Sequence, residues 1–538
     1  MASARRLLLA LLGGAAVGVA FPPIGAWPLL VVGLVALLAS LQGQSGWRGA
    51  QLGLVFGLTS MAIMLPWVRV IGPDAWAALT VLEALFFAGF GAAAALVRPY
   101  RWWPVATACL WVLTELARSH VPFTGFPWGK VAFALTDAPV AGYVRYLGVP
   151  GLGALVLLLA AMVWWGLLRA HTDWRSAMAS WLAAAAVVAL GAVLPVGSAG
   201  GAGTLSVAAV QGGIPGTGAD GLGEQREVVD NHARATQRYA EQVRTGAADP
   251  ADVVFWPENS TDIDPFADNE TYAAIDAAVD DVGVPVLVGA LTAGSTPDTR
   301  RNVGLVWSPE TGPSDDFYVK RNLVPFGEYI PLRDVLAPMF SRLDQIPRDF
   351  EPGDEPGVLD LGPVVVADAM CYDVAFEGVI APAVEAGAEL LVVQTNNATY
   401  QGTGQPEQQW AISRMRALEA GRDLVVASTN GISGVVAADG SVLTRSTTKD
   451  PVVLTANVQL ADGLTPAVRF GSLLEKALAL LGVLAIGAAI VLGRRRAGSA
   501  GASGTAPGPS TPPPAGSSTG PSTGQARPVA GAASGPAG

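Results

Sequence analysis

Eight apolar stretches constrain this chain more than any other feature of its sequence. Seven lie before residue 198 and one follows residue 471. They cover about residues 7–20, 28–42, 50–67, 75–97, 103–117, 149–168, 177–196 and 472–493. A helix needs about 20 mostly apolar residues to cross the hydrocarbon core of a membrane, and several of the stretches have that length. The pattern predicts a multi-span α-helical membrane domain of eight helices, with a long segment between the seventh and the eighth.

The first apolar stretch also has features of a cleavable signal peptide. Arg5 and Arg6 precede it, and small residues follow near Ala20. Because further membrane helices follow, we expect this stretch to be retained as the first span.

Basic residues in the loops predict the orientation of the helices. With the N-terminus inside, the inner loops and the two ends carry ten basic residues, and the outer loops carry four: Arg69, Arg118, Lys130 and Arg145. Basic residues favour the cytoplasmic side. We therefore expect both ends of the chain inside the cell and residues 198–471 on the outer face of the membrane.

The distribution of charged residues separates residues 198–471 from the rest of the chain. Residues 198–471 contain 38 Asp and Glu against 17 Lys and Arg, whereas the rest contains 6 acidic against 16 basic residues. Only 14% of all residues are charged, against roughly 25% in soluble proteins, which argues against an ordinary cytosolic enzyme. No basic face is available for phosphates, so nucleic acid is not an expected partner. Two cysteines and three histidines give no sign of a metal site, and we expect no cofactor.

The long acidic segment has the pattern of an α/β domain. Apolar runs of strand length lie at residues 205–210, 253–256, 284–289, 303–307, 317–319, 364–369, 390–394 and 424–428, and helical stretches lie at 223–244 and 405–421. Strands that alternate with helices indicate a layered fold with buried strands. The predicted organisation is a membrane domain (1–197), an extracytoplasmic catalytic domain (198–471), an eighth span (472–493) and a disordered cytoplasmic tail (494–538), which is rich in Gly, Pro, Ser, Ala and Thr.

Three polar residues stand directly after strand-like runs of this segment: Glu258, Lys320 and Cys371. Sites in α/β proteins gather at strand ends. Taken singly, each residue is more often a solvated charge or a core thiol. Together they form a set for acyl transfer, in which a thiol attacks, an ammonium lowers the thiol pKa and stabilises an oxyanion, and a carboxylate moves protons. A Ser-His-Asp triad would need His232, which lies in the polar helical run.

The sequences around these residues resemble the three core motifs of the nitrilase superfamily. They read Trp256-Pro257-Glu258, Lys320 to Pro331 (KRNLVPFGEYIP) and Cys371-Tyr372-Asp373. The long central motif resembles one branch in particular, the apolipoprotein N-acyltransferases. Further matches are Phe21-Pro22-Pro23, Gly125 to Trp128 (GFPW), Val207 to Gly212 (VAAVQG) and Arg414 to Glu419 (RMRALE). The resemblance extends from about residue 6 to residue 493.

The resemblance implies a nitrilase-like αββα sandwich and a catalytic triad of Glu258, Lys320 and Cys371. It gives supporting roles to Tyr372, Asp373 and Glu328. Glu328 is expected to orient Lys320 or Glu258, with a salt bridge to Arg321 or Arg333 as the alternative. Two positions depart from the family pattern: Asn397 stands where relatives commonly have Asp, and Asp373 where many have Glu.

The resemblance also implies the substrates and the location. The expected acyl donor is a membrane phospholipid, the acceptor is the N-terminal amine of a diacylglyceryl-cysteine apolipoprotein, and the reaction passes through a cysteine thioester. We expect a monomer in the bacterial plasma membrane.

Two other classes of protein stay open from the residues alone. A membrane-anchored amidase would use the same triad with water as the acceptor. A transporter or receptor would need charged groups inside the spans, for which Glu83, Glu115 and Lys476 are the candidates. Trp67 is expected to belong to an interfacial aromatic belt, whereas Phe126-Pro127-Trp128 fits either such a belt or a lipid entry portal.

Overall fold

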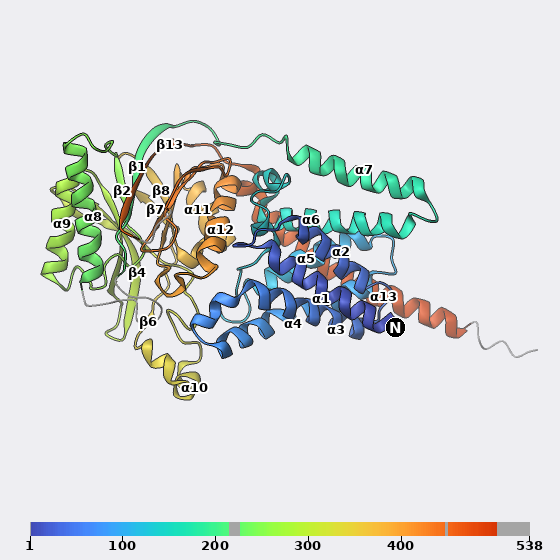
Figure 1. Ribbon diagram of the computed structural model, residues 1–538. Helices are drawn as coiled ribbons and strands as arrows, with labels where there is room; N and C mark the ends of the chain where they lie inside the picture. Colours follow the sequence, from blue (N-terminus) through green and yellow to red (C-terminus); the bar gives the residue numbers. More distant parts are fainter. Residues whose placement is uncertain (1, 215–225, 447–449, 503–538) are drawn as a thin grey trace, which may run out of the picture. The chain divides into compact units, whose positions relative to one another are not determined.

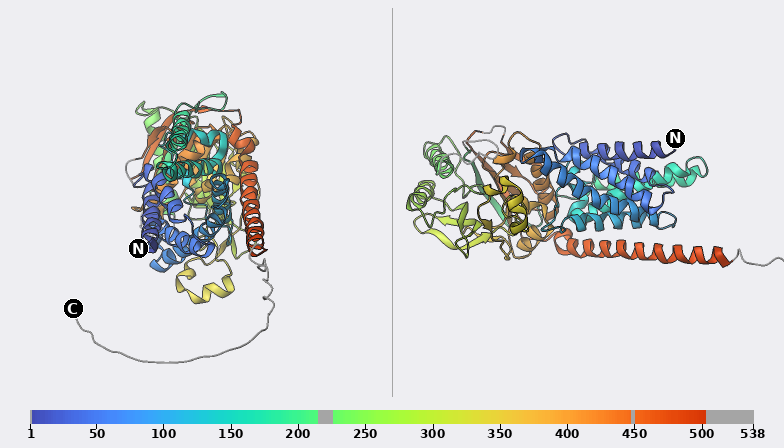
Figure 2. Two further views of the ribbon diagram at one scale, coloured as in Figure 1. Left: turned by 90° about the vertical axis from the view of Figure 1, so that its right-hand side faces the viewer. Right: turned by 90° about the horizontal axis from the view of Figure 1, so that it is seen from below.

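Every predicted apolar stretch forms a helix. The computed structural model describes residues 2–214, 226–446 and 450–502, and the chain forms one unit up to Ile490 and a second from Val491 onward. The apolar helices are α1 (Ala2–Ala20), α2 (Pro28–Ser40), α3 (Gly46–Met64), α4 (Pro73–Val97), α5 (Trp103–Arg118), α6 (Val144–Arg169), α7 (Trp174–Gly191) and α13 (Pro466–Ala502). Within the first unit, α1 to α7 lie at one end and the β-sheets at the other (Figures 1 and 2).

Five of the helices in the described residues are long and apolar enough to cross a membrane. These segments are Ser3–Ala20, Pro73–Val97, Ala141–Arg169, Trp174–Gly191 and Pro466–Arg496. The helix α2 is apolar but shorter.

Local sequence explains where several of these helices begin. The side chains of Ser45 and Asp173 precede α3 and α7, and each accepts a hydrogen bond from a backbone N–H in the first turn of its helix. The helix α13 begins at Pro466, six residues before the predicted start of the last span, and proline is favoured in a first helical turn. The same helix continues to Ala502, beyond the predicted start of the tail at residue 494, and residues 503–538 of that tail lie outside the described residues.

The helix α1 packs closely against α2. A Cβ atom on Gly13 would lie 2.8 Å from the carbonyl oxygen of Gly33, so glycine is needed for this approach of the two backbones.

Two β-sheets form the centre of the α/β domain. The first has the order β13-β1-β2-β3-β4-β5, with β6 (Asp349–Phe350) paired to β4, and the second has the order β12-β11-β10-β9-β8-β7. The strands of the first sheet are β1 (Gly203–Gln211), β2 (Val253–Phe255), β3 (Val286–Ala293), β4 (Thr299–Ser308), β5 (Gly312–Val319) and β13 (Val452–Leu460). Those of the second are β7 (Val358–Asp360), β8 (Val365–Met370), β9 (Leu390–Thr395), β10 (Leu424–Ser428), β11 (Gly434–Val436) and β12 (Val442–Arg445).

Helices cover the outer face of each sheet, which gives the predicted αββα layering (Figure 1). The helices α8 (Glu227–Arg244) and α9 (Asn269–Val282) lie on the first sheet, and α11 (Glu377–Glu385) and α12 (Gln405–Ala420) lie on the second. Apolar side chains such as Val207 and Val366 fill the space between the sheets. The core beneath α11 and α12 is continuous with that of the membrane helices, because Met415 and Trp111 belong to one cluster of buried residues. The catalytic domain is thus packed against the membrane part through its α11–α12 layer.

Candidate active site

The three predicted catalytic residues lie just past the ends of three strands in two different sheets. Glu258 follows β2 and Lys320 follows β5, both in the first sheet, whereas Cys371 follows β8 in the second. Glu258 and Lys320 are buried, with 3% and 1% of their surface exposed, and Cys371 is partly exposed. The two sheets therefore present the three side chains to one another at one edge of the sandwich.

Lys320 lies between two carboxylates. Its Nζ is 2.8 Å from Oε1 of Glu258 and 2.9 Å from Oε1 of Glu328. The side-chain amide of Asn302 donates to the same two oxygens, at 2.7 and 3.2 Å. Burial alone would lower the pKa of Lys320, but the charges of Glu258 and Glu328 outweigh it and raise that pKa well above 10.5. Lys320 is therefore a fixed cation at neutral pH.

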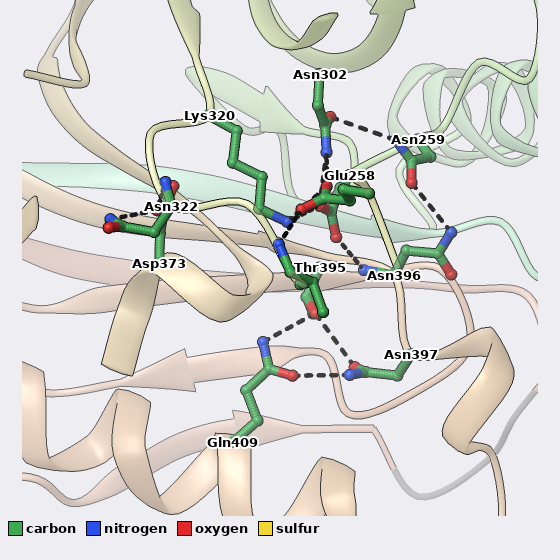
Figure 3. A network of polar contacts seen from close by, with 12 residues as sticks. Glu258, Asn259, Asn302, Lys320, Asn322, Asp373, Thr395, Asn396, Asn397 and Gln409 are labelled. Carbon is green, nitrogen blue, oxygen red and sulfur yellow. Dashed lines mark hydrogen bonds and ion pairs between the residues drawn. The ribbon is translucent and has the colours of Figure 1, made fainter. Parts of the chain in front are cut away.

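The second carboxylate oxygen of Glu258 is held by the opposite sheet. Oε2 accepts a hydrogen bond of 2.9 Å from the backbone N–H of Asn396, just after β9 (Figure 3). The Asn396 side chain also donates to Asn259, at 3.3 Å. Both oxygens of Glu258 thus have fixed partners, which orient the carboxylate.

Cys371 has an unusual backbone conformation. It begins the short helix η7 (Cys371–Ala375) with a φ of +49°. A left-handed conformation costs a residue other than glycine roughly 1–2 kcal/mol, and such strain is frequent at active sites. The turn sets the thiol at the end of β8 instead of in the interior of the sheet.

The Cys371 thiol is protonated at rest. Burial, followed by the charge of Glu258, raises its pKa to about 12, although Lys320 and a hydrogen bond with Thr395 act in the other direction. The charge of Lys320 lowers the thiol pKa, as expected, but burial and the two carboxylates outweigh the single cation. Attack by this sulfur would therefore require a base that takes the thiol proton.

Asp373 links the Cys371 turn to the loop that carries Lys320. Its Oδ1 accepts hydrogen bonds from the backbone and side-chain nitrogens of Asn322, at 2.8 and 2.9 Å, and its Oδ2 accepts from the hydroxyl of Tyr318, at 2.8 Å. Although Asp373 is shorter than the Glu that many relatives have at this position, both of its carboxylate oxygens thus have hydrogen-bond partners.

Tyr372 points toward the membrane part. Its hydroxyl donates to the carbonyl oxygen of Gly125 at 2.8 Å, and its ring is nearly parallel to that of Trp128, with centroids 6.3 Å apart.

Glu328 faces Lys320 and not the two arginines of the alternative interpretation. Arg333 pairs with Asp349, and Arg321 donates to the carbonyl oxygen of Gly378. The other oxygen of Glu328 accepts from the backbone N–H of Val324 at 2.8 Å.

The expectation that Trp67 belongs to an interfacial belt is wrong. Only 8% of Trp67 is exposed, and its ring contacts those of Trp128 and Tyr400. Trp128 is 3% exposed. Both indoles donate hydrogen bonds to Gln408 of α12, so both tryptophans lie where the α/β domain meets the apolar helices.

Two acidic residues within the spans have polar partners inside the protein. Oε2 of Glu83 lies 2.6 Å from Nε of Arg118, with both side chains buried, and Oε1 of Glu115 accepts hydrogen bonds from Trp111 and from the backbone N–H of Val131. The pair of Glu83 with Arg118 is typical of a structural ion pair. Lys476 is exposed on α13.

Sequence reasoning missed Asn302, Thr395 and the role of Asn396. Asn302 lies directly before the apolar run Val303 to Trp307 of β4, and it is 1% exposed. The position of this amide beside a strand-like run was the feature of the sequence that could have indicated its role, because a buried amide needs polar partners. His232 is also buried, and burial lowers its pKa to about 4. It bonds the carbonyl oxygen of Val228 within its own helix and has no place in a triad. In the described ranges, no group of three or more His, Cys, Asp or Glu side chains has the arrangement of a metal site.

Comparison with known proteins assigns the family. Residues 13–162 match the family described as "Apolipoprotein N-acyltransferase N-terminal domain", and residues 206–463 match "Carbon-nitrogen hydrolase". A relative from Mycolicibacterium smegmatis, "Apolipoprotein N-acyltransferase", is 35% identical over 89% of this chain and 84% of its own length. The chain belongs to the apolipoprotein N-acyltransferase family. Another member, from Nitrosomonas europaea, is 32% identical over 91% of this chain and 99% of its own length.

Among solved structures, an amidase from Nesterenkonia sp. is similar to part of this chain. It is 19% identical, with a TM-score of 0.34, and the match covers 50% of this chain and 94% of the amidase. The chain joins apolar helices to a carbon-nitrogen hydrolase domain.

Proposed function

We propose that this chain transfers an acyl group from a membrane phospholipid, through a thioester on Cys371, to the N-terminal amine of diacylglyceryl-cysteine apolipoproteins. The observation that carries the proposal is the approach of Glu258 and Lys320 to 2.8 Å in a buried site next to a cysteine that follows a strand of the opposite sheet. Family membership supplies the substrate classes.

In the first stage, the Cys371 sulfur attacks the ester carbonyl of the phospholipid while Glu258 takes the thiol proton. The high pKa of the thiol favours this concerted transfer over a resting thiolate. The oxyanion forms near the Lys320 ammonium and the backbone N–H that follows Cys371, both of which stabilise negative charge. When the C–O bond breaks, the leaving lysophospholipid oxygen takes the proton from Glu258, and the thioester remains.

In the second stage, the apolipoprotein amine replaces the lysophospholipid. The amine nitrogen attacks the thioester carbonyl, Glu258 takes a proton from nitrogen, and the same cation stabilises the second oxyanion. The amide forms as the C–S bond breaks, and the proton returns to Cys371. Since one chain supplies the whole triad, we propose a monomer as the active form.

The proposal is tested with purified enzyme and labelled phospholipid in the absence of any acceptor. Intact-protein mass spectrometry is expected to show one acyl group, released by hydroxylamine, on the wild type and none on Cys371→Ala. Cys371→Ser, with a much less acidic nucleophile, is expected to be nearly inactive. If the wild type carries no adduct, or if Cys371→Ala still acylates lipoprotein, the covalent mechanism is wrong.

The amidase alternative differs in the second stage, where water would resolve the thioester. Mass spectrometry of lipoprotein N-termini, from cells with and without the gene, distinguishes the two. An amide-linked acyl chain that requires the gene supports the transferase, and its presence in both strains would contradict it.

We also propose that the catalytic domain lies on the outer face of the bacterial plasma membrane. The support is the distribution of ten basic residues on the inner side against four on the outer side. Reporter fusions at residues 171 and 500 are expected inside, and one at residue 300 outside. An inside signal at residue 300 would overturn this orientation.

A further inference from the structure

Gln408 lies on α12, where the catalytic domain meets the membrane part, and its amide has four hydrogen bonds. Its Oε1 accepts from the indole N–H groups of Trp67 and Trp128, at 3.0 and 2.8 Å. Its Nε2 donates to the carbonyl oxygens of Pro22 and Met64, at 3.0 and 2.9 Å. Only 4% of Gln408 is exposed. Because indoles only donate and carbonyls only accept, the amide has a single orientation and its hydrogen-bonding capacity is fully used.

The two carbonyl groups belong to the membrane part. Met64 is the last residue of α3, and Pro22 lies in the turn between α1 and α2. Carbonyl groups in the last turn of a helix have no partner within that helix. A side chain of the catalytic domain therefore satisfies backbone groups of two membrane segments and, through the same amide, fixes two indole rings.

Each of these indoles contacts an aromatic ring next to the proposed nucleophile. The ring of Trp67 meets that of Tyr400 edge to face, at 5.1 Å and 85°, and the ring of Trp128 lies nearly parallel to that of Tyr372, at 6.3 Å and 17°. Tyr372 follows Cys371 in the chain. The positions of both aromatic pairs thus depend on one amide oxygen.

An acyl chain attached to Cys371 needs an apolar path from the sulfur toward the membrane helices, since apolar surface is stable only away from water. Trp67 and Trp128 lie in the connections between those helices. Their rings contact Tyr400 and Tyr372, the aromatic neighbours of Cys371. We propose that Gln408 is a positioning residue that fixes Trp67 and Trp128 as the walls of the acyl-chain site and so determines which acyl lengths are accepted. This inference rests on the proposed function.

The test is the acyl-length profile of the thioester formed without acceptor, from an equimolar mixture of phospholipids with chains of 12 to 20 carbons. Gln408→Met keeps the volume of the side chain but leaves both indole N–H groups without an acceptor. One methylene in a fitted apolar site is worth roughly 10-fold or more in rate. We therefore expect the preference between chains two carbons apart to fall by about 10-fold in Gln408→Met.

A second variant and a matched control separate positioning from general stability. Gln408→Glu keeps an acceptor for both indoles but removes donors to the two carbonyls, and it is expected to retain the wild-type profile even if its thermal midpoint falls. Arg414→Ala removes another contact between α12 and the membrane part, the ion pair of 2.8 Å with Asp137, without touching either indole. It is expected to leave the profile unchanged.

The results of these assays distinguish the role of Gln408 from the proposed function. An unchanged profile in Gln408→Met, or an equal change in Arg414→Ala, would overturn the role of Gln408 while the thioester itself persists. If Gln408→Met does not fold, an altered profile in Gln408→Glu overturns the inference, and a retained profile supports it. A wild type that forms no thioester with any phospholipid would instead refute the proposed function.

Discussion

Asp373 and Asn322 form a double hydrogen bond that joins the Cys371 turn to the Lys320 loop. One carboxylate oxygen of Asp373 accepts from both the backbone and the side-chain nitrogen of Asn322. The two loops come from different sheets, so this contact contributes to the distance between Cys371 and Lys320.

Replacement of Asp373 by Asn is expected to slow thioester formation. The amide would place a donor against the donors that the carboxylate now accepts, at a cost of about 1–3 kcal/mol for unpaired buried groups. We expect the rate to fall by about 10-fold or more, as measured by acyl-adduct formation over time. Asp373→Glu keeps both acceptor oxygens and should retain more activity than Asp373→Asn; the reverse order would contradict this role.

Replacement of Lys320 by Ala is expected to reduce both stages by about 100-fold or more, as when an oxyanion donor is removed. The change also leaves Glu258 and Glu328 buried together without their shared cation. Single-turnover assays of adduct formation and of aminolysis measure the two stages separately. Arg321→Ala is the control, since Arg321 donates to Gly378 and does not face Glu258; equal losses in both variants would argue against a specific role for Lys320.

The pKa of the Cys371 thiol predicts how its alkylation depends on pH. With a pKa of about 12, the thiolate fraction at pH 7 is about 10⁻⁵ and rises 10-fold per pH unit. In the wild-type protein, the rate of iodoacetamide labelling should therefore rise about 10-fold per unit between pH 7 and 10. A rate that levels off below pH 9 would show that the thiol is more acidic than its burial implies.

Asp368 is a buried carboxyl group whose removal is expected to stabilise the protein. It is 1% exposed, and burial, followed by the charge of Asp373, raises its pKa well above 3.8. The group is therefore neutral when folded and ionised when unfolded at pH values between the two pKa values, so stability falls as pH rises through that window.

In the variant Asp368→Asn, this side chain carries no charge at any pH, so the variant avoids the fall in stability as pH rises. Its advantage over the wild type in the free energy of unfolding should vanish below pH 3.8 and grow by about 1.4 kcal/mol per pH unit above it, up to the folded pKa. Thermal midpoints in detergent from pH 4 to 8 test this. The exposed Asp315→Asn should show no such trend, and a variant that is less stable than the wild type at pH 7 would refute the prediction.

Glu83→Gln is expected to destabilise the helical part. It removes the charge that pairs with the fully buried Arg118, and the loss of one partner of a buried ion pair costs about 3–5 kcal/mol. The measurement is the thermal midpoint in detergent. Glu83→Gln with Arg118→Met removes both charges and should recover part of the loss; a double variant less stable than the single one would contradict this explanation.

The sequence was most informative where one pattern dominated. Hydropathy located every apolar helix, and runs such as residues 390–394 and 424–428 gave β9 and β10, because these strands are fully buried. The strand β13 was missed, since most of its residues are exposed or only half-buried and Thr455, Asn457 and Gln459 interrupt its apolar residues.

The residues of the candidate site also differ in whether the sequence could predict them. Motifs and strand ends located Glu258, Lys320 and Cys371, whereas Asn302 and Gln408 could not be assigned. Their roles depend on partners 44 and 280–386 residues away in the chain, and such contacts leave no local pattern. The high pKa of the Cys371 thiol could not be predicted either, because burial is a property of the fold and not of the motif.

The pairing of β1 with β13 has a consequence for the order of synthesis. Gly203 lies opposite Leu460 and Gln211 opposite Val452, so a strand near the start of the catalytic domain finds its outer partner about 250 residues later. Until that partner emerges from the ribosome, one edge of β1 carries unpaired backbone groups, which promote association with other chains. Closure of the first sheet and formation of the last apolar helix, which begins only six residues after β13, are therefore successive events of synthesis.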